Sequence, residues 1–469
     1  MCVLLCWCGS AYLIRASWIA FQENPINFGV ETTYLNWNTE FPSVVICEAK
    51  SDERIGDLIE KHRPEFFDED DEDRFERRFD LLTIYQEIAF FDGLPYTVQK
   101  ECFDRQVYDE VMKCPKTDYF ELAKWLRFNC TEIFHFCSWN DVQFNCCEYF
   151  LPLDTETGPC YAINNLNTRQ QRHLDMISNK STGPGAMTLH FREKIKVYVL
   201  SKEEVPHATS SDVTYFRMAK GSTFESYVKV NDIENDPAVR DIDIKRRSCR
   251  FADENFLDIY PVYSPSACEV NCRLKLQMKL CNCTNFFMPG VDKEYHCDIY
   301  GLLCLRSHVV ELSTRKESLS SKRIGFYCKC EEGCTTKIIA FVRFLREIRS
   351  KKETGITRLK LKMNNLPSEL FKRSVVRGKL DLVVSMGGAA GLFVGASLLS
   401  FVELIYFFTI RLFVNIRRGS GRQSQVKGVV APDGKVKKII FCFKNLFTRT
   451  NYKQEIHSTR QFYQPTRLS

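Results

Sequence analysis

The sequence predicts an α+β membrane protein, in which two transmembrane helices flank a large disulfide-rich extracellular domain with a β-rich core and peripheral helices. Three observations lead to this prediction. Residues 382–410 form a run of 29 positions without Lys, Arg or Asp. Of the 22 cysteines, 18 fall between Cys47 and Cys334. The residues after position 410 are strongly basic, which is the charge bias found on the cytoplasmic side of membrane spans.

Residues 1–21 are predicted to form a first transmembrane helix that is cut short at its start. The stretch MCVLLCWCGSAYLI is apolar for 14 residues before Arg15, whereas a full span needs about 20 residues. A cleaved signal peptide is the alternative interpretation. Such a peptide normally begins with a basic region, and no basic residue precedes this stretch.

Residues 22–381 are predicted to form one extracellular domain, because they show no internal repeat and no low-complexity linker. The even number of cysteines between Cys47 and Cys334 predicts disulfides, which form in an oxidising compartment. Three glycosylation sequons lie in the same interval, and they predict glycans at Asn129, Asn179 and Asn282. Each sequon is weak evidence alone, but together they agree with exposure to the secretory lumen.

Within this domain, apolar residues alternate at 195–199, 228–230 and 359–363, which predicts half-buried strands. Residues 55–61 and 119–126 are helix-like. The apolar residues between Ile338 and Ile348 have helical spacing, and this segment is left open between helix and strand. The acidic run EFFDEDDED at 65–73 is interpreted as a solvated face. A cation or proton sensor is the alternative for this run, since clustered carboxylates raise one another's pKa.

The cysteines between Cys268 and Cys334 are the densest chemical feature of the chain. Four closely spaced thiolates can bind zinc, but eight cysteines beside a sequon favour disulfides, and no metal is expected. No GxxxxGK[ST], HExxH or GxSxG motif is present, and the eight histidines are scattered. The sequence therefore predicts neither an enzyme nor a bound cofactor.

Residues 382–410 are predicted to form the second transmembrane helix, since a straight helix of this length measures roughly 43 Å against a hydrocarbon core of about 30 Å. Glu403 is the one ionisable group in this run, and a carboxylate at membrane depth indicates a polar pathway. A simple anchor that dimerises through Gly387, Gly391 and Gly395 is the alternative. It leaves Glu403 unexplained.

The residues from 411 to 469 contain 13 Lys or Arg and two acids, a net charge of +11. The whole chain carries +6, so residues 1–410 carry −5. This asymmetry predicts a cytoplasmic tail, next to anionic lipid, and no nucleic-acid partner. The predicted location is therefore the plasma membrane, with two spans, the cysteine-rich domain outside and the C-terminus inside.

Four sequence blocks identify a family: FPSVVIC, KRRSCRFADE, the CxxxC and CxC cysteines that begin at Cys268, and GLFVGASLLSFVE. In this order and spacing they resemble the degenerin/epithelial sodium channel family, and within it the arthropod pickpocket branch. The resemblance implies a homo- or heterotrimer of related subunits that conducts Na+ and is blocked by amiloride. A non-conducting receptor or regulatory subunit of the same shape is the alternative. No motif identifies the chemical or mechanical stimulus that opens the pore.

The resemblance also implies the residues of the pore. The selectivity filter is expected at Gly395, Ala396 and Ser397, and the ion pathway at Val384, Gly388, Gly391 and Glu403, with Gly391 also in the blocker site. On a straight helix Ser397 would point nearly away from Gly395, so both can line one lumen only if the backbone opens between them. Such irregular backbone is tolerated at membrane depth where it faces water.

The resemblance implies seven disulfides: Cys47–Cys160, Cys130–Cys137, Cys249–Cys334, Cys268–Cys330, Cys272–Cys328, Cys281–Cys304 and Cys283–Cys297. Three of them form a nested ladder between residues 249 and 334. Such a ladder is expected to be a stiff rod that transmits a distant signal to the membrane. Cys102, Cys114, Cys146 and Cys147 are left without a predicted partner.

Overall fold

The computed structural model describes residues 2–23, 25–32, 38–50, 55–58, 83–90, 118–210, 215–316, 318, 320–348, 355–366, 369–395 and 397–419. The acidic run at 65–73, Cys102, Cys114 and the basic tail beyond Gly419 lie outside these residues. The chain divides into two compact units, and the division falls between Val394 and Gly395. Each unit is described separately below.

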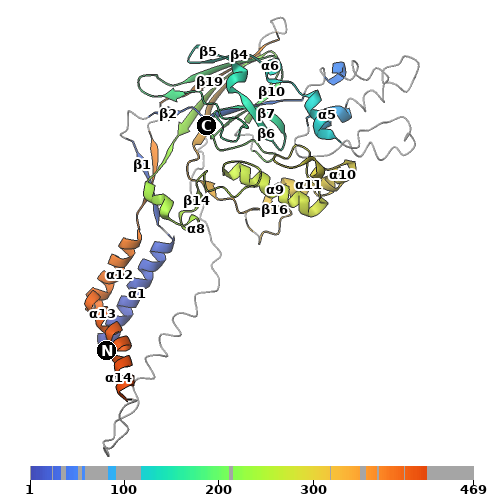
Figure 1. Cartoon of the computed structure of the whole chain (residues 1–469). Helices are drawn as coiled ribbons and strands as arrows, with labels where there is room; N and C mark the ends of the chain where they lie inside the picture. Colours follow the sequence, from blue (N-terminus) through green and yellow to red (C-terminus); the bar gives the residue numbers. More distant parts are fainter. Residues whose placement is uncertain are drawn as a thin grey trace, which may run out of the picture. The chain divides into compact units, whose positions relative to one another are not determined.

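The first unit begins and ends with apolar helices that lie side by side, α1 (Cys2–Glu23) and α12 (Lys379–Val394) (Figure 1). A three-stranded sheet connects them to the rest of the unit. Its middle strand β20 (Leu370–Val375) pairs antiparallel with β1 (Ile26–Glu31) and parallel with β13 (Ile233–Asn235). Because β1 follows α1 directly and β20 directly precedes α12, this sheet brings both helices to one end of the domain.

Two larger sheets form the β-rich core. The six-stranded sheet has the order β18 (Ile338–Ile348), β12 (Ser222–Asn231), β19 (Thr357–Met363), β9 (Ala186–Phe191), β4 (Phe134–Trp139) and β5 (Val142–Phe144). The five-stranded sheet has the order β11 (Tyr215–Met218), β10 (Ile195–Leu200), β3 (Ser43–Glu48), β7 (Gly158–Ile163) and β6 (Leu151–Thr155). The strands predicted at 195–199, 228–230 and 359–363 are thus confirmed.

The five-stranded sheet is covered on both faces. Val44 and Ile46 of β3 pack with Leu189 and Leu361 of the six-stranded sheet. Val45, one residue along the strand, belongs to a second cluster that includes Ala267 of helix α9 (Pro265–Cys281). All six residues of β3 are consequently buried, as expected for a strand with no solvent-exposed face.

Helix α9 covers the outer side of the five-stranded sheet. Helices α5 (Tyr119–Leu126), α10 (Ile299–Ser307) and α11 (Val309–Ser313) share a separate hydrophobic cluster next to α9 (Figure 1). The prediction of a helix at 119–126 is confirmed, and residues 55–58 of the predicted helix at 55–61 are helical. Helix α9 begins with Pro265, and the Ser264 hydroxyl accepts a hydrogen bond from the Ala267 N–H at 3.1 Å. Both features are typical of a helix start.

The first unit also contains short elements. They include the helices α6 (Cys130–Ile133), α7 (Cys146–Tyr149) and α8 (Ile244–Arg247), the 3-10 helices η3 (Pro237–Asp241) and η4 (Lys293–Tyr295), and the strand pairs β2 (Thr39–Glu40) with β8 (Ile177–Ser178), β14 (Cys249–Arg250) with β17 (Glu332–Gly333), and β15 (Arg315–Lys316) with β16 (Phe326–Tyr327).

The segment left open at 338–348 is the strand β18, which pairs antiparallel with β12 along its whole length. The pairing passes from Arg343, opposite Tyr227, to Phe341, opposite Val228, so Val342 is an extra residue in a β-bulge. A bulge interrupts the alternation of side chains between the two faces of a strand. The apolar residues therefore lose their two-residue period, and their spacing resembles that of a helix.

Six of the seven disulfides implied by the resemblance are present: Cys47–Cys160, Cys249–Cys334, Cys268–Cys330, Cys272–Cys328, Cys281–Cys304 and Cys283–Cys297. The sulfur atoms of Cys268, Cys328 and Cys330 lie close enough together to hold a metal ion. All three cysteines belong to disulfides, however, so they are not available as thiolate ligands.

The expected pair Cys130–Cys137 is wrong. Cys130 is bonded to Cys147 and Cys137 to Cys146, with Cα separations of 5.8 and 5.4 Å. Cys137 lies three residues into β4, where it is fully buried, and an extended strand carries it about 10 Å from its start. The hairpin β4–β5 then reverses the direction of the chain and places α7 beside β4 and α6. There Cys146 bonds to Cys137, and Cys147 bonds to Cys130.

Candidate functional site

The first part of the candidate site is the break in helical structure after α12. Helix α12 ends at Val394, and helix α13 (Leu398–Tyr406) begins four residues later. Gly395 has a φ of +66°, a left-handed conformation that glycine adopts at little cost. Ser397 is extended, with φ −103° and ψ 166°. The backbone therefore opens at the predicted filter.

Ser397 also caps the N-terminus of α13. Its hydroxyl accepts a hydrogen bond from the Ser400 N–H at 3.3 Å, and its own N–H donates to the Ser400 hydroxyl at 3.3 Å. A serine in this position satisfies N–H groups at a helix start that have no partner within the helix. The polar side chain at the break thus has a structural role that sequence reasoning did not predict.

Two opposite faces of α12 have different environments. Ala389 and Ala390 are buried against α1, where the Ser385 hydroxyl lies 3.3 Å from that of Ser17. The predicted pathway residues Val384, Gly388 and Gly391 fall within an arc of about 60° on the other side of the helix. All three are exposed, and Val384 is 64% exposed. The structure therefore groups these three residues on the face that α1 leaves uncovered.

Gly387 and Gly388 of α12 do not pack against α1. A Cβ atom added to Gly387 or Gly388 would meet no atom within 4 Å. The close approach of the two helices instead depends on Gly9 of α1, where an added Cβ would lie 2.9 Å from the Phe393 ring. The small residues of α12 at 387 and 388 are free to face another chain or a lumen.

In the second unit, Glu403 lies on α13, among exposed and almost entirely apolar residues. Helix α13 continues through a π-helical turn, η5 (Phe407–Arg411), into α14 (Leu412–Gly419). The Thr409 hydroxyl donates to the carbonyl oxygen of Ile405 at 2.5 Å in this turn. The helical structure therefore extends beyond Ile410, where the predicted span ends.

Within the part of the chain that the structure describes, two helical regions are long and apolar enough to cross a membrane, Leu4–Glu23 and Leu399–Ile416. Nearly all side chains of the second region are exposed, which distinguishes it from the core helix of a water-soluble protein. These two regions agree with the predicted fold class. The fully described length of α1, 22 residues, reaches the thickness of a hydrocarbon core.

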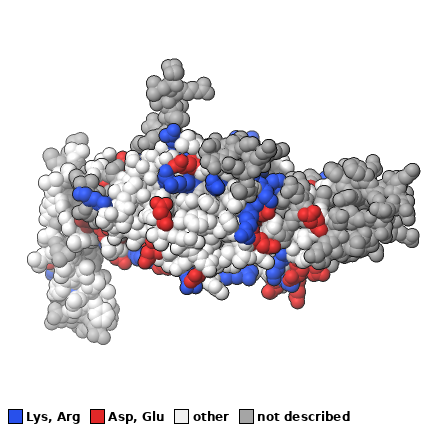
Figure 2. Space-filling model, turned by 90° about the horizontal axis from the view of Figure 1, so that it is seen from above, with Lys and Arg blue, Asp and Glu red and all other residues white. Residues whose placement is uncertain are grey.

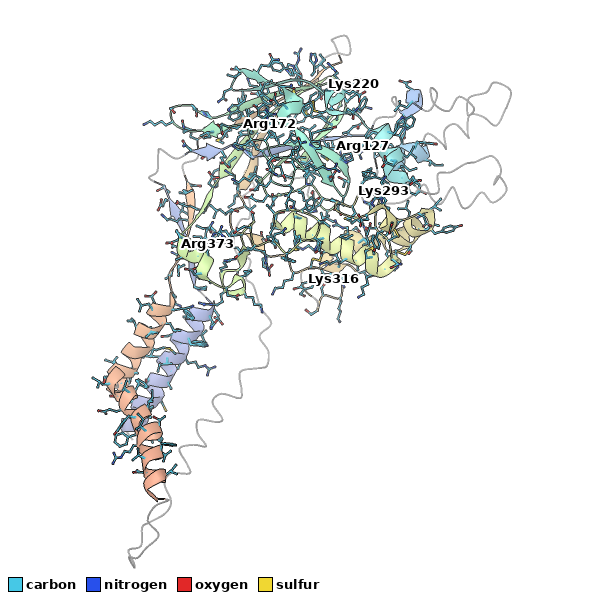
Figure 3. The ribbon with its side chains drawn as sticks, in the orientation of Figure 1. Arg127, Arg172, Lys220, Lys293, Lys316 and Arg373 are labelled. Atoms are coloured by element: carbon cyan, nitrogen blue, oxygen red, sulfur yellow. A yellow bond between two sulfur atoms is a disulfide. The ribbon has the colours of Figure 1, made fainter. Side chains whose placement is uncertain are left out.

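Arg373 connects the disulfide-rich domain to α12. It lies on β20, and its guanidinium donates to the Cys334 carbonyl at 3.1 Å and to the Asn235 side chain at 3.1 Å. The Cys249 sulfur is 2.9 Å away, and burial lowers the pKa of this arginine. Arg373 thus attaches the Cys249–Cys334 disulfide to the strand that continues into α12 (Figure 3).

Arg246 makes the corresponding contact with α1. Its guanidinium donates to the Phe21 carbonyl at 2.7 Å and lies 3.9 Å from the centre of the Phe21 ring. In the sequence, the KRRSC block that contains Arg246 indicates a resemblance to a family but predicts no contact with the first helix. A basic run that ends two residues before Cys249 was the available signal, but the partner of Arg246, Phe21, lies 225 residues away in the sequence.

A buried charged cluster joins α9 to the five-stranded sheet. Arg273 of α9 forms an ion pair with Glu156, and both side chains are 1% exposed. Glu269, one turn earlier, pairs with Arg315. His207 lies 3.9 Å from Glu269, and burial lowers its pKa. No sequence motif identified this cluster, because its members come from four separate segments of the chain.

Comparison with known proteins gives one consistent result. The family model described as "Amiloride-sensitive sodium channel" matches residues 1–407. A sodium channel protein Nach from Drosophila ananassae is 24% identical over 431 residues, which cover 86% of this chain and 79% of the relative. Pickpocket protein 19 from Drosophila melanogaster is 22% identical over 319 residues, which cover 61% of this chain and 62% of the relative.

More distant matches are also found. Acid-sensing ion channel 2 from Rattus norvegicus is 26% identical over 174 residues, 33% of this chain and 32% of that protein. Among solved structures, the match to a proton-activated chloride channel covers 87% of this chain and 96% of the channel's chain. The identity is 7% and the TM-score is 0.25.

Proposed function

Because the chain belongs to the amiloride-sensitive sodium channel family, we propose that it is one subunit of a trimeric, sodium-selective channel of the plasma membrane that amiloride blocks. Membership makes the chain a sodium channel subunit and a membrane protein rather than an enzyme. The trimer, the blocker and the filter residues are the proposed details. The opening of the backbone between Gly395 and Ser397 is the observation that supports the filter most directly.

A filter must replace the hydration shell of an ion with oxygen atoms at close range. Backbone that is not helical has carbonyl groups free for this purpose, and Gly395 adds no side chain. Ser397 contributes a hydroxyl, and its backbone is extended and exposed. Three copies around an axis would form a narrow ring of oxygen atoms. Ala396 lies between these residues and outside those that the structure describes.

The two faces of α12 support the assignment of the pathway. Since α1 covers Ala389 and Ala390, the exposed face with Val384, Gly388 and Gly391 is the one left for a lumen or for related subunits. We place the blocker at Gly391, next to the filter in sequence. We place Glu403 on the cytoplasmic side of the filter, where three carboxylates would concentrate Na+.

Ser397→Leu is the substitution that tests the filter. We expect the ratio of sodium to potassium permeability to fall about tenfold, the equivalent of about 1.4 kcal/mol, because the larger side chain displaces an oxygen from the ring. Reversal potentials under voltage clamp, with related subunits co-expressed where the chain is silent alone, give this ratio. Phe401→Leu is the matched control, since Phe401 is 55% exposed and lies on the side of α13 opposite Glu403.

The same recordings separate the competing interpretations. Glu403→Gln is expected to lower single-channel conductance with a smaller change in the permeability ratio, because a ring of charge acts on ion concentration. An unchanged ratio in Ser397→Leu together with robust current would exclude the filter assignment. If the chain reaches the cell surface but its pore substitutions never change the recorded current, the chain is the non-conducting receptor or regulatory subunit.

The proposed topology places the disulfide-rich domain outside the cell and the basic tail beside anionic lipid inside it. Asn129 and Asn282 are exposed, so a glycan on either asparagine would extend into solvent. Asn129→Gln and Asn282→Gln should each increase electrophoretic mobility by one glycan, and endoglycosidase treatment should abolish the difference. Identical mobility of both variants and the parent chain before digestion would contradict this topology.

A further inference from the structure

The outer face of α9 carries a repeated pattern of basic and apolar residues. Cys272, Lys275, Leu276 and Lys279 are spaced at three and four residues, which places them on one side of the helix. The other side of α9 supplies the buried residues, such as Arg273 and Gln277. The outer face contributes half-buried Leu276 to the edge of a hydrophobic cluster, and it also contains the Cys272–Cys328 disulfide.

The strands β15 and β16 form the opposite wall. Their register places Lys316 beside Tyr327, and the Phe326 N–H donates to the Thr314 carbonyl at 2.9 Å. Gly325 permits this close approach, since an added Cβ would collide with the Thr314 carbonyl oxygen and the residue has a φ of +150°. Phe326 is buried, whereas Tyr327 is 37% exposed. Lys316 therefore lies next to the apolar side chains of Phe326 and Tyr327.

Between these walls lies a pocket of about 380 Å³, lined by Lys275, Leu276, Lys279, Lys316, Phe326 and Tyr327 among others. This volume is within the range of sites for small organic ligands, which are roughly 300–1,000 Å³. Its surface is mainly apolar, and the charged side chains that line it are all lysines. The pocket lies at the lower edge of the domain, where Figure 3 labels Lys316.

The charges of the pocket are poorly compensated. Lys275 pairs with Asp258 at 3.3 Å, but both side chains are more than half exposed, so the pair is weak. The ammonium groups of Lys279 and half-buried Lys316 make no ion pair or hydrogen bond with the residues that the structure describes. On the face seen from above, in contrast, basic and acidic residues lie close together (Figure 2). Unpaired ammonium groups around an apolar pocket are complementary to an anion with an apolar body.

We propose that this pocket binds a small amphipathic organic anion, with a carboxylate, sulfate or phosphate group held by Lys279 and Lys316 and an aromatic or alkyl body against Leu276, Phe326 and Tyr327. Inorganic anions would use the lysines but gain nothing from the apolar surface. Neutral aromatic molecules would gain the apolar contacts but not the ionic ones. Both kinds of interaction together distinguish this class of ligand.

Photolabelling of the purified full chain with 4-benzoylbenzoate, an aromatic carboxylate, tests the proposal. Peptide mapping is expected to find the label in residues 275–279 or 325–327. Labelling should fall at least about tenfold in Lys279→Glu/Lys316→Glu, which is the equivalent of about 1.4 kcal/mol. Neutral benzophenone should label the same peptides about tenfold less than the carboxylate does. Lys316→Arg should retain most of the labelling, because the positive charge is kept.

Lys124→Glu is the matched control, since Lys124 is exposed on α5, outside the pocket, and it should not change the labelling. If the double variant fails to give folded protein, Lys279→Gln replaces it, because Lys279 is exposed; a reduction of about threefold is expected, about half of the tenfold effect in free energy. Equal labelling of parent chain and folded variant, equal labelling by benzophenone, or a label confined to other peptides would overturn the proposal.

Discussion

Arg273→Met is expected to destabilise the disulfide-rich domain by about 3 to 5 kcal/mol and to prevent most of the chain from reaching the cell surface. Arg273 and Glu156 are both 1% exposed, so the substitution would leave a buried carboxylate without its ion-pair partner. The arginine also donates to the Leu312 carbonyl at 3.1 Å and to the Thr209 hydroxyl at 3.0 Å. All of these contacts link α9 to segments that are distant in sequence.

Surface biotinylation and thermal unfolding of the purified protein would measure this effect. Arg172→Met is the matched control, because Arg172 also pairs with a glutamate, Glu148, but the two side chains are 54% and 36% exposed. An exposed pair contributes about 0 to 1 kcal/mol. Arg172 and Arg273 belong to the same domain, so a general sensitivity to the loss of an arginine would affect both variants alike.

Adding Glu156→Gln to Arg273→Met should recover part of the lost stability, because no unpaired charge then remains in the interior. An equal melting temperature for Arg273→Met and Arg172→Met would show that the buried pair is not needed for stability. A double variant that is less stable than Arg273→Met would show that the unpaired carboxylate is not the cause.

Cys272→Ser is expected to cost about 2 to 5 kcal/mol and to leave a reactive thiol at Cys328. The Cys272–Cys328 disulfide closes a segment of 56 residues and is the innermost rung of the ladder that also contains Cys268–Cys330 and Cys249–Cys334. Its loss frees the unfolded chain of a long-range constraint. Reduced export and maleimide labelling of Cys328 under denaturing conditions are the expected results.

Two further variants control this experiment. Cys272→Ser/Cys328→Ser should lose the same stability without the free thiol, which separates the missing cross-link from thiol reactivity. Cys8→Ser should have little effect, because Cys8 is exposed and unpaired in α1. Normal surface delivery of Cys272→Ser with an unreactive Cys328 would mean that this rung is not formed in the mature protein.

Several elements could be predicted from short stretches of sequence. The apolar runs identified the helices at both ends of the described chain, and alternation identified β10, β12 and β19. Helix α5 has the predicted bounds of 119–126. The opening at Gly395–Ser397 was also predicted, because a glycine and a serine two residues apart cannot face one lumen from an unbroken helix.

Other features escaped prediction for reasons that lie in the neighbouring strands and helices. The bulge at Val342 gave β18 a helix-like pattern, which only its pairing with β12 resolves. The hairpin β4–β5 brings α7 beside α6 and so determines that Cys130 bonds to Cys147 and not to Cys137. The spacing of the cysteines along the chain does not show that the hairpin reverses the chain and brings α7 beside α6.

By itself, the sequence determined the two apolar helices, the cysteine-rich domain between them, the family, and the position of the break before Ser397. The helices and the break depend on residues within a few positions of one another, where the helix period determines which side chains share a face. The cysteine-rich domain and the family follow from the composition and from the order of the four sequence blocks. Only the tertiary structure decided that α1 covers Ala389 and Ala390, and that Arg273 finds Glu156. The last two partners are 117 residues apart, and a buried charge is stable only where the fold brings its counter-charge to it.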